Sequence, residues 1–304
     1  MDTIVRPAGA NAEDRTSRTL RLSDGRRLSY AEFGDSQGLP VLAIHGTPGS
    51  RFMFGLTDGA ARDRGLRIIA PDRPGYGRSD YRRNLSLMRS AEDFVALVDG
   101  LGVERLAVIG VSGGGPHAIA TASAIPERVA LLALISPVGP IAECRKQIRM
   151  SRMHRLIFTK MGRSPPACAS FFWSLRSMVR WVPGVAYRAL QQRVTRSDQD
   201  VLRQSEVKAN LQAAIREGLR PGIKGALQDL RLFCSPWGLP LADIGVPAVM
   251  WQGSDDTIVP PSAAYHLAAQ LPNCRLDVIQ EAGHYWGFGN FAHILDTVRA
   301  VLRS

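Results

Sequence analysis

Short runs of apolar residues alternate with segments of helical composition along most of the 304-residue chain. Four of these runs cover residues 41–45, 67–70, 106–111 and 129–136, and nearly every position within them is apolar. A strand that is apolar on both faces is typical of a parallel sheet that helices cover on both sides. The alternation therefore predicts an α/β fold built on a mainly parallel sheet.

The N-terminal part of the chain shows a different pattern. Residues 18–33 alternate with period two on each side of Asp24 and Gly25, which predicts a hairpin with a tight turn. The preceding residues, 1–17, lack an apolar stretch and contain acids, so they do not have the pattern of a secretory signal. We expect them to form a flexible tail.

The alternation of strands and helices is interrupted once. It stops near residue 140 and resumes with a strand at 246–252, a helix at 262–271, a strand at 275–279 and a helix at 291–302. The intervening segment is rich in arginine and helical in composition. We therefore expect an α/β domain formed by residues 18–139 and 241–304, with residues 140–240 inserted into it as a helical unit.

The inserted segment also holds the excess positive charge. The chain has 38 basic and 27 acidic residues, a formal charge of +11, whereas residues 141–235 have 18 basic and 6 acidic residues, a balance of +12. A solvated arginine-rich surface explains this surplus. A cationic rim that attracts an anionic substrate, carrier or membrane surface explains it too. Nucleic acid is not an expected partner, because no recognition motif accompanies the charge.

Two further features limit the class of protein. The longest fully apolar run, residues 129–135, is much shorter than the roughly 20 residues of a membrane-spanning helix, so we expect no span. The four cysteines form no CxxC pair, which argues against a zinc site and a disulfide scaffold. Their pattern favours a reducing, cytoplasmic compartment, and nothing in the sequence calls for a metal or an organic cofactor. These cysteines are Cys144, Cys168, Cys234 and Cys274.

The most informative motif is GVSGG at residues 110–114, between a predicted strand and a predicted helix. Glycines permit the sharp strand-to-helix turn that projects Ser112 at the positive end of the helix. A phosphate-binding P-loop is excluded because no Lys-Ser or Lys-Thr pair follows the glycines. We therefore predict Ser112 as a nucleophile, supported by Gly110 and Gly114.

With this motif in place, the chain from residue 18 onward resembles the α/β-hydrolase superfamily. HGTPG at residues 45–49 stands where that family has its oxyanion loop, and PDRPGYGRS at 71–79 resembles the turn after its next strand. A serine, an acid and a histidine also follow one another in the family's order. The resemblance implies an α/β-hydrolase fold with a mostly parallel eight-stranded sheet flanked by helices, and it makes residues 140–240 a helical cap.

A serine hydroxyl needs a general base, and a histidine is the expected one. His284 follows the last predicted strand, so it lies at the same sheet edge as Ser112. Among the other histidines, we expect His45 to belong to the oxyanion loop or to be structural, and His117 to be packed. The remaining ones are His266 and His293, which we place in peripheral helices, and His154 in the insertion.

The base needs an acid that holds its tautomer and stabilises its protonated form. Two adjacent acids, Asp255 and Asp256, follow the strand at 246–252. The family pattern Gly-x-x-Asp-x-x-Val-Pro selects Asp256 and leaves Asp255 as a turn residue.

The attacked carbonyl oxygen becomes negatively charged and requires fixed N–H donors. We expect these donors to be the backbone N–H groups of Thr47 and Gly113. Gly46 and Gly49 would let the backbone approach closely, and Pro48 is a candidate for a cis peptide bond because the loop is tight.

The cap and the histidine loop supply candidates for the substrate pocket, because apolar clefts are the usual binding sites of small molecules. The apolar cap residues can equally form the core of the cap itself. The candidates are His154, Phe172, Trp173, Tyr285 and Trp286.

These residues predict a serine hydrolase that cleaves a carboxylic ester, thioester or lactone through an acyl-enzyme. The expected substrate is a small hydrophobic acyl compound, and the basic surplus is a weak indication of an anionic group on it. Three alternatives remain: a carbon–carbon bond hydrolase, a cofactor-free perhydrolase or haloperoxidase with the same triad, and a non-catalytic ligand receptor of the same fold.

Overall fold

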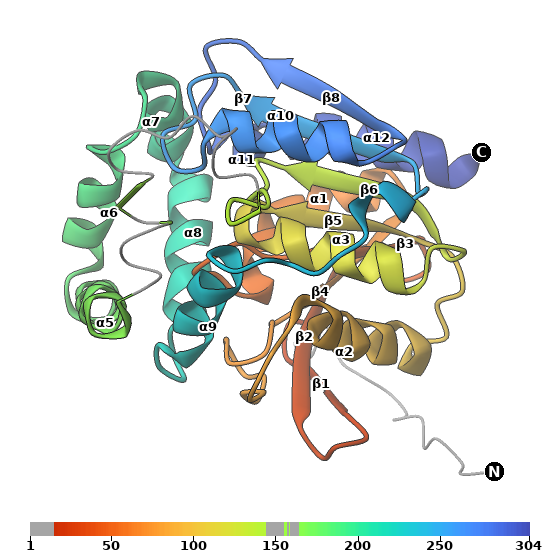
Figure 1. The fold of residues 1–304 in the computed structure, drawn as a ribbon, viewed down its shortest axis with the longest axis horizontal. Helices are drawn as coiled ribbons and strands as arrows, with labels where there is room; N and C mark the ends of the chain where they lie inside the picture. Colours follow the sequence, from red (N-terminus) through yellow and green to blue (C-terminus); the bar gives the residue numbers. More distant parts are fainter. Residues whose placement is uncertain (1–14, 144–154, 157, 159–163) are drawn as a thin grey trace.

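The computed structural model describes residues 15–143, 155, 156, 158 and 164–304 (Figure 1). Its centre is an eight-stranded sheet in the order β1-β2-β4-β3-β5-β6-β7-β8. The pairs β1–β2 and β2–β4 are antiparallel and all other pairs are parallel, which confirms the predicted sheet. The strands are β1 (Arg18–Arg21), β2 (Arg27–Gly34), β3 (Leu39–Ile44), β4 (Leu66–Pro71), β5 (Leu106–Val111), β6 (Val129–Ile135), β7 (Ala248–Gly253) and β8 (Cys274–Ile279).

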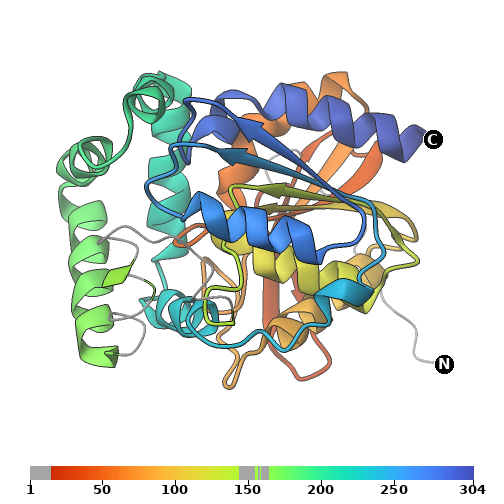
Figure 2. The same ribbon diagram turned by 45° about the horizontal axis from the view of Figure 1, so that its top comes forward.

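Helices cover both faces of the sheet (Figures 1 and 2). In β5, Leu106 and Val108 belong to the hydrophobic cluster on one face, and Ala107 and Ile109 to the cluster on the other. Successive side chains of such a strand enter the hydrophobic cores on opposite faces of the sheet, so every position in the strand must be apolar. The first face is covered by α2 (Leu87–Gly100), α3 (Gly115–Ala124) and α10 (Pro261–Gln270), and the second by α1 (Asp58–Asp63) and α12 (Phe291–Arg303).

The described part of the inserted segment is helical, and it lies beyond the carboxyl ends of the parallel strands (Figure 1). Within the described residues, no helix has both the length and the apolar character needed to cross a bilayer. The helices of this cap are α5 (Pro165–Trp181), α6 (Pro183–Gln191), α7 (Arg196–Arg203), α8 (Ser205–Gly218) and α9 (Lys224–Phe233).

The N-terminal hairpin forms as expected, with β1 paired to β2 and Gly25 at a positive φ of 84° in the turn. Residues 15–17, at the end of the expected tail, contact the core. The carbonyl oxygen of Arg15 accepts the N–H of Glu32, and that of Thr16 accepts the Nε–H of Arg51. These backbone contacts hold residues 15–17 against the core.

Helix α2 follows a serine that caps its first turn. Ser86 is the N-cap, and its hydroxyl oxygen accepts the N–H of Arg89. Ser90 lies one turn further on, fully buried, and its hydroxyl bonds to Nδ1 of His117. Both serines can cap a helix, but the burial of Leu87 extends the helix back to Ser86.

The contact between β5 and α3 leaves no room for a side chain at Gly110. A Cβ there would lie 2.7 Å from Cβ of Ala118 and 2.8 Å from Cα of Gly115.

We expect Gly110→Ala to lower the free energy of unfolding by about 1–3 kcal/mol through overpacking. Chemical denaturation measures this change. Gly59→Ala on α1 is the control, because no atom lies within 4 Å of its added Cβ. The control should raise stability by about 0.4–1 kcal/mol, and equal effects of the two substitutions would contradict the packing argument.

Candidate active site

Ser112 lies at the turn from β5 into α3, where its backbone has a φ of 51°. A positive φ is unfavourable for a residue with a side chain and persists only when the surroundings enforce it. Here the backbone is closely packed, because a Cβ on Gly114 would lie 2.2 Å from the carbonyl oxygen of Ile44. The glycines on both sides of Ser112 are thus required by the turn that exposes its hydroxyl at the sheet edge.

The structure brings the three residues of the predicted triad together. His284 follows β8, and its Nδ1 lies 2.7 Å from Oδ2 of Asp256, which follows β7. Its Nε2 lies 3.0 Å from Oγ of Ser112. Because Asp256 accepts the Nδ1 proton, Nε2 is left to accept the proton of the serine hydroxyl.

The surroundings of Asp256 keep this carboxylate charged and fixed. Its Oδ1 accepts the backbone N–H groups of Ile258 and Val259, both at 2.8 Å, and Oδ2 accepts Nε2–H of Gln252 at 3.1 Å. Burial raises its pKa, but the charge of His284 and these hydrogen bonds outweigh burial, so the pKa of Asp256 lies below its usual value. Asp255 is exposed, and the side-chain contact of its carboxylate is with Ser254.

The same pairing acts on His284 in the opposite direction. Burial lowers the pKa of the imidazole, since it penalises the charged form. The carboxylate of Asp256 outweighs burial through its charge and hydrogen bond, so the pKa of His284 lies above the usual 6.5. The pair therefore favours a histidine that can hold the proton it takes from a nucleophile.

The two loops expected to form the oxyanion hole are in direct contact. A Cβ on Gly113 would lie 2.4 Å from Oγ1 of Thr47, and one on Gly46 would lie 3.2 Å from Cβ of Ser112. The Thr47–Pro48 peptide bond is cis. The side chain of Thr47 thus lies beside Gly113, and Gly46 lies beside Ser112. That the N–H groups of Thr47 and Gly113 bind the oxyanion stays a prediction.

His45 supports this loop from inside the core. Its Nε2 accepts the backbone N–H of Arg73 at 3.1 Å, so its proton lies on Nδ1, which donates to the carbonyl oxygen of Gly46 at 2.8 Å. Burial and the charge of Arg73 lower the pKa of His45 well below 6.5. A neutral, fully buried imidazole with both nitrogens occupied has a structural role.

A buried carboxylate of the cap, Asp229 on α9, holds the same loop. It accepts the hydroxyl of Thr47 at 2.6 Å and the guanidinium of Arg73 at 2.7 Å, and it also accepts the hydroxyl of Tyr76. Although burial raises its pKa, the charge of Arg73 and its hydrogen bonds hold the pKa of Asp229 well below the usual value. No sequence pattern marks Asp229 itself, but its partners Arg73 and Tyr76 both belong to the 71–79 motif.

A second buried carboxylate of the cap contacts the histidine loop. Asp198 on α7 accepts the backbone N–H of His284 at 2.9 Å and that of Tyr285 at 2.7 Å. No local pattern marks Asp198 in the sequence either, because its partners lie 86 and 87 residues away.

The pocket candidates have different positions. The ring of Tyr285 lies edge-on to that of His284, with centroids 5.4 Å apart. Phe172 is instead buried in the core of the cap with Leu219 and Ile223. Trp173 is 51% exposed with the guanidinium of Arg176 over its ring, so it faces solvent instead of a pocket.

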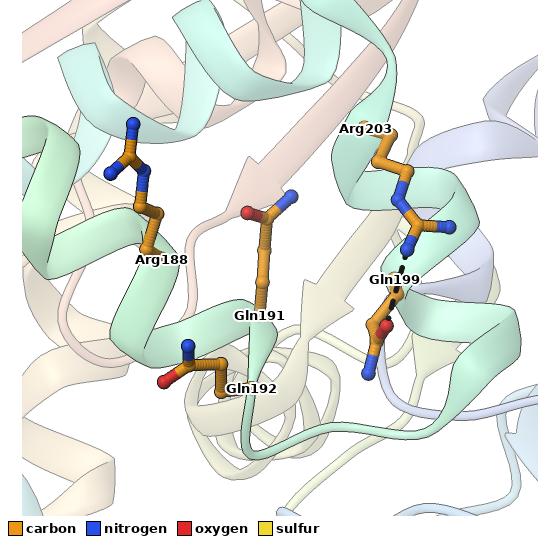
Figure 3. Close-up of a pocket in the computed structure, with 5 residues that line it drawn as sticks. All are labelled: Arg188, Gln191, Gln192, Gln199 and Arg203. Carbon is orange, nitrogen blue, oxygen red and sulfur yellow. Dashed lines mark hydrogen bonds between the residues drawn. The ribbon is translucent and has the colours of Figure 1, made fainter.

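Of the other two candidates, Trp286 lies edge-on to the ring of His293 at the edge of a core cluster. His154 lies outside the described residues. A hollow on the cap surface, shown in Figure 3, is lined by α6 and α7 and contains none of the triad residues. Its residues are Arg188, Gln191, Gln192, Gln199 and Arg203.

Comparison with known proteins agrees with this architecture. The α/β hydrolase fold family matches residues 40–290, so the chain belongs to that family. An uncharacterized hydrolase of Bacillus subtilis, YcgS, is 29% identical over 275 residues, which is 88% of this chain and 92% of the relative. A non-heme chloroperoxidase of Streptomyces lividans is 38% identical over 131 residues, or 40% of this chain and 45% of that protein.

Among solved structures, the esterase EaEST from Exiguobacterium antarcticum has a TM-score of 0.70 and 18% identity. The match covers 95% of this chain and 100% of the esterase. This similarity shows a common fold. Together with the hydrolase relative, it supports the conclusion that the chain is an enzyme of the hydrolase type.

The adjacent acids allow a matched test of the triad. We expect Asp256→Asn to lower kcat for a p-nitrophenyl ester by at least about 100-fold, because an amide cannot hold the productive histidine tautomer. Asp255→Asn should leave kcat within about twofold, because that side chain does not touch His284. Steady-state kinetics measures both values. A similar loss in the two variants would contradict the assignment of the acid.

The raised pKa of His284 predicts a pH dependence. The base works in its neutral form, so kcat/KM should rise with pH through a midpoint above 6.5. In Asp256→Asn the carboxylate that raises this pKa is gone, so the midpoint should move to lower pH. A pH–rate profile of both proteins tests this prediction, and an unmoved midpoint would contradict it.

Proposed function

We propose that the protein is a serine hydrolase that cleaves a carboxylic ester, thioester or lactone through an acyl-enzyme. The observation that supports this most strongly is the pair of hydrogen bonds that His284 forms, from Nδ1 to Oδ2 of Asp256 at 2.7 Å and from Nε2 to Oγ of Ser112 at 3.0 Å. Asp256 accepts the Nδ1 proton, and Nε2 can accept the hydroxyl proton of Ser112, as nucleophilic attack requires. That hydroxyl lies at a glycine-lined turn.

The proposed reaction has two halves. Oγ of Ser112 bonds to the carbonyl carbon while its proton passes to Nε2 of His284, and the carbonyl electron pair moves onto the oxygen. The N–H groups of Thr47 and Gly113 stabilise that negative charge. The intermediate then expels an alcohol or thiol, which takes the proton from His284.

In the second half, His284 removes a proton from water, and the hydroxide attacks the ester bond between the acyl group and Ser112. A second tetrahedral intermediate collapses, and the serine oxygen leaves with the proton from His284. The carboxylic acid is released and the free hydroxyl is restored. For a lactone, the leaving alcohol and the acid remain in one molecule.

The surroundings of the triad support a hydrophobic acyl group. The ring of Phe233 on α9 lies 2.9 Å from the position of a Cβ on Gly113, and the ring of Tyr285 lies against His284. Apolar walls beside the reacting atoms favour an apolar substrate and exclude water. The basic surplus of the cap adds weaker support for an anionic group on the substrate.

Two other candidates have support from relatives: perhydrolysis from the chloroperoxidase, which is similar to 40% of this chain, and carbon–carbon bond hydrolysis from 2-hydroxymuconate semialdehyde hydrolase of Pseudomonas putida, which is 26% identical over 87% of it. The same triad would form a peracid when hydrogen peroxide replaces water in the second half. Comparing kcat/KM for acyl esters, thioesters and lactones with peroxide-dependent halogenation separates hydrolysis from perhydrolysis. A carbon–carbon bond hydrolase would cleave a diketone-type substrate in preference to all of these.

A fluorophosphonate probe tests for an activated serine. We expect stoichiometric labelling of Ser112, detected by mass spectrometry of the peptide that contains it. Labelling should disappear in Ser112→Ala and persist in Ser254→Ala, whose side chain bonds to Asp255. Absence of labelling in well-folded wild-type protein would favour the receptor alternative.

A further inference from the structure

The catalytic histidine lies between two carboxylates that come from different parts of the fold. Asp256 of the core holds its ring at Nδ1, whereas Asp198 of the cap holds its backbone. The two oxygens of Asp198 each accept one N–H, Oδ2 from His284 and Oδ1 from Tyr285. Asp198 therefore binds the backbone on both sides of the His284 Cα atom, and the position of that backbone determines where the imidazole ring lies.

The fit between Asp198 and the histidine loop is close. Asp198 is only 1% exposed, and a Cβ on Gly283 would lie 2.1 Å from its Oδ2. Glycine at 283 is thus required by the approach of a cap side chain. The loop is also shaped at Glu281, whose φ is 58°. A loop with this conformation depends on its hydrogen bonds for a defined position.

Helix α7 is itself anchored, so Asp198 can transmit the position of the cap. Leu202 is fully buried, and its carbonyl oxygen accepts the hydroxyl of Tyr187 on α6 at 2.8 Å. Val201 lies within 3.6 Å of the position of a Cβ on Gly289, at the end of α11 (Trp286–Gly289). Near the start of α7, the hydroxyl of Thr195 accepts the N–H of Asp198.

We propose that Asp198 is a positioning residue through which the cap fixes the loop of the general base, so that His284 reaches Ser112 only when α7 is seated. The proposal rests on the proposed function, in which His284 is that base. In this proposal the cap covers the site and also positions its general base.

The charge of Asp198 provides a readout that a merely structural contact would lack. The groups that face His284 are Asp256 after β7, Asp198 on α7, Ser112 at the turn after β5 and the neighbouring Tyr285. Both carboxylates raise the pKa of His284. Replacing Asp198 by a neutral side chain should therefore move the acidic limb of kcat/KM to lower pH.

The test compares Asp198→Asn and Asp198→Ala with Asp200→Asn. Asp200 is a matched control, because it lies on the same helix with its side chain 62% exposed and paired with Arg203. For both Asp198 variants we expect kcat for a p-nitrophenyl ester to fall about 10- to 100-fold, because the base is misplaced. KM should stay within about twofold, and the control should match wild type.

Hydrogen exchange of the amides of His284 and Tyr285 gives a readout that does not depend on activity. We expect exchange in a peptide covering residues 282–286 to be at least about tenfold faster in Asp198→Ala than in Asp200→Asn. Near-UV circular dichroism checks the fold, and Asp198→Asn, which keeps the volume of the side chain, serves if the alanine variant unfolds.

Two results would overturn the proposal: unchanged kcat in Asp198→Asn, whatever its KM, or unchanged exchange at residues 282–286 in Asp198→Ala. Failure of the proposed function is distinguishable. In that case wild-type protein and Ser112→Ala would behave alike towards ester and fluorophosphonate, while the exchange experiment would still report on the contact between Asp198 and the loop.

Discussion

The positive backbone φ of Ser112 is the constraint on which the site depends. It is tolerated because α3 packs directly on β5 and because the loop after β3 approaches the turn with no intervening side chain. The absence of a side chain at Gly110 permits the first contact, and its absence at Gly114 permits the second. The result is a hydroxyl held at the sheet edge, at the start of a helix, where the carboxyl ends of the neighbouring strands deliver the other groups.

From that turn the remaining parts follow by topology. Strand β7 lies next to β6 and parallel β8 lies next to β7, so the loops that follow these two strands bring Asp256 and His284 to the same edge. The cap then adds one carboxylate beside the oxyanion loop and one beside the histidine loop. Asp229 binds Thr47 of the oxyanion loop, and Asp198 binds the backbone of the histidine loop. Because both carboxylates are buried, the cap cannot shift without breaking contacts to groups that surround the reacting atoms.

The sequence predicts the core well where the determinants are local. Continuous apolar runs identify the strands, and GVSGG identifies the turn because Gly110 packs against Gly115 and Ala118, a few residues further along the chain. Long-range partners are beyond such reasoning. Asp198 and Asp229 meet their partners 86 and 182 residues away in the chain, and no spacing rule connects them. Helical composition likewise does not reveal which face is buried, so Phe172 and Trp173 were both pocket candidates although one lies in the core of the cap and the other faces solvent.

The proposed chemistry requires that Ser112 becomes covalently acylated. This is tested by rapid quenching after mixing with a p-nitrophenyl ester of a bulky acid, followed by mass spectrometry of the peptide containing Ser112. We expect a burst of p-nitrophenol approaching one equivalent per protein and an added acyl mass on Ser112 that decays as acid appears. Ester turnover with neither the burst nor the acyl mass on that peptide would contradict it.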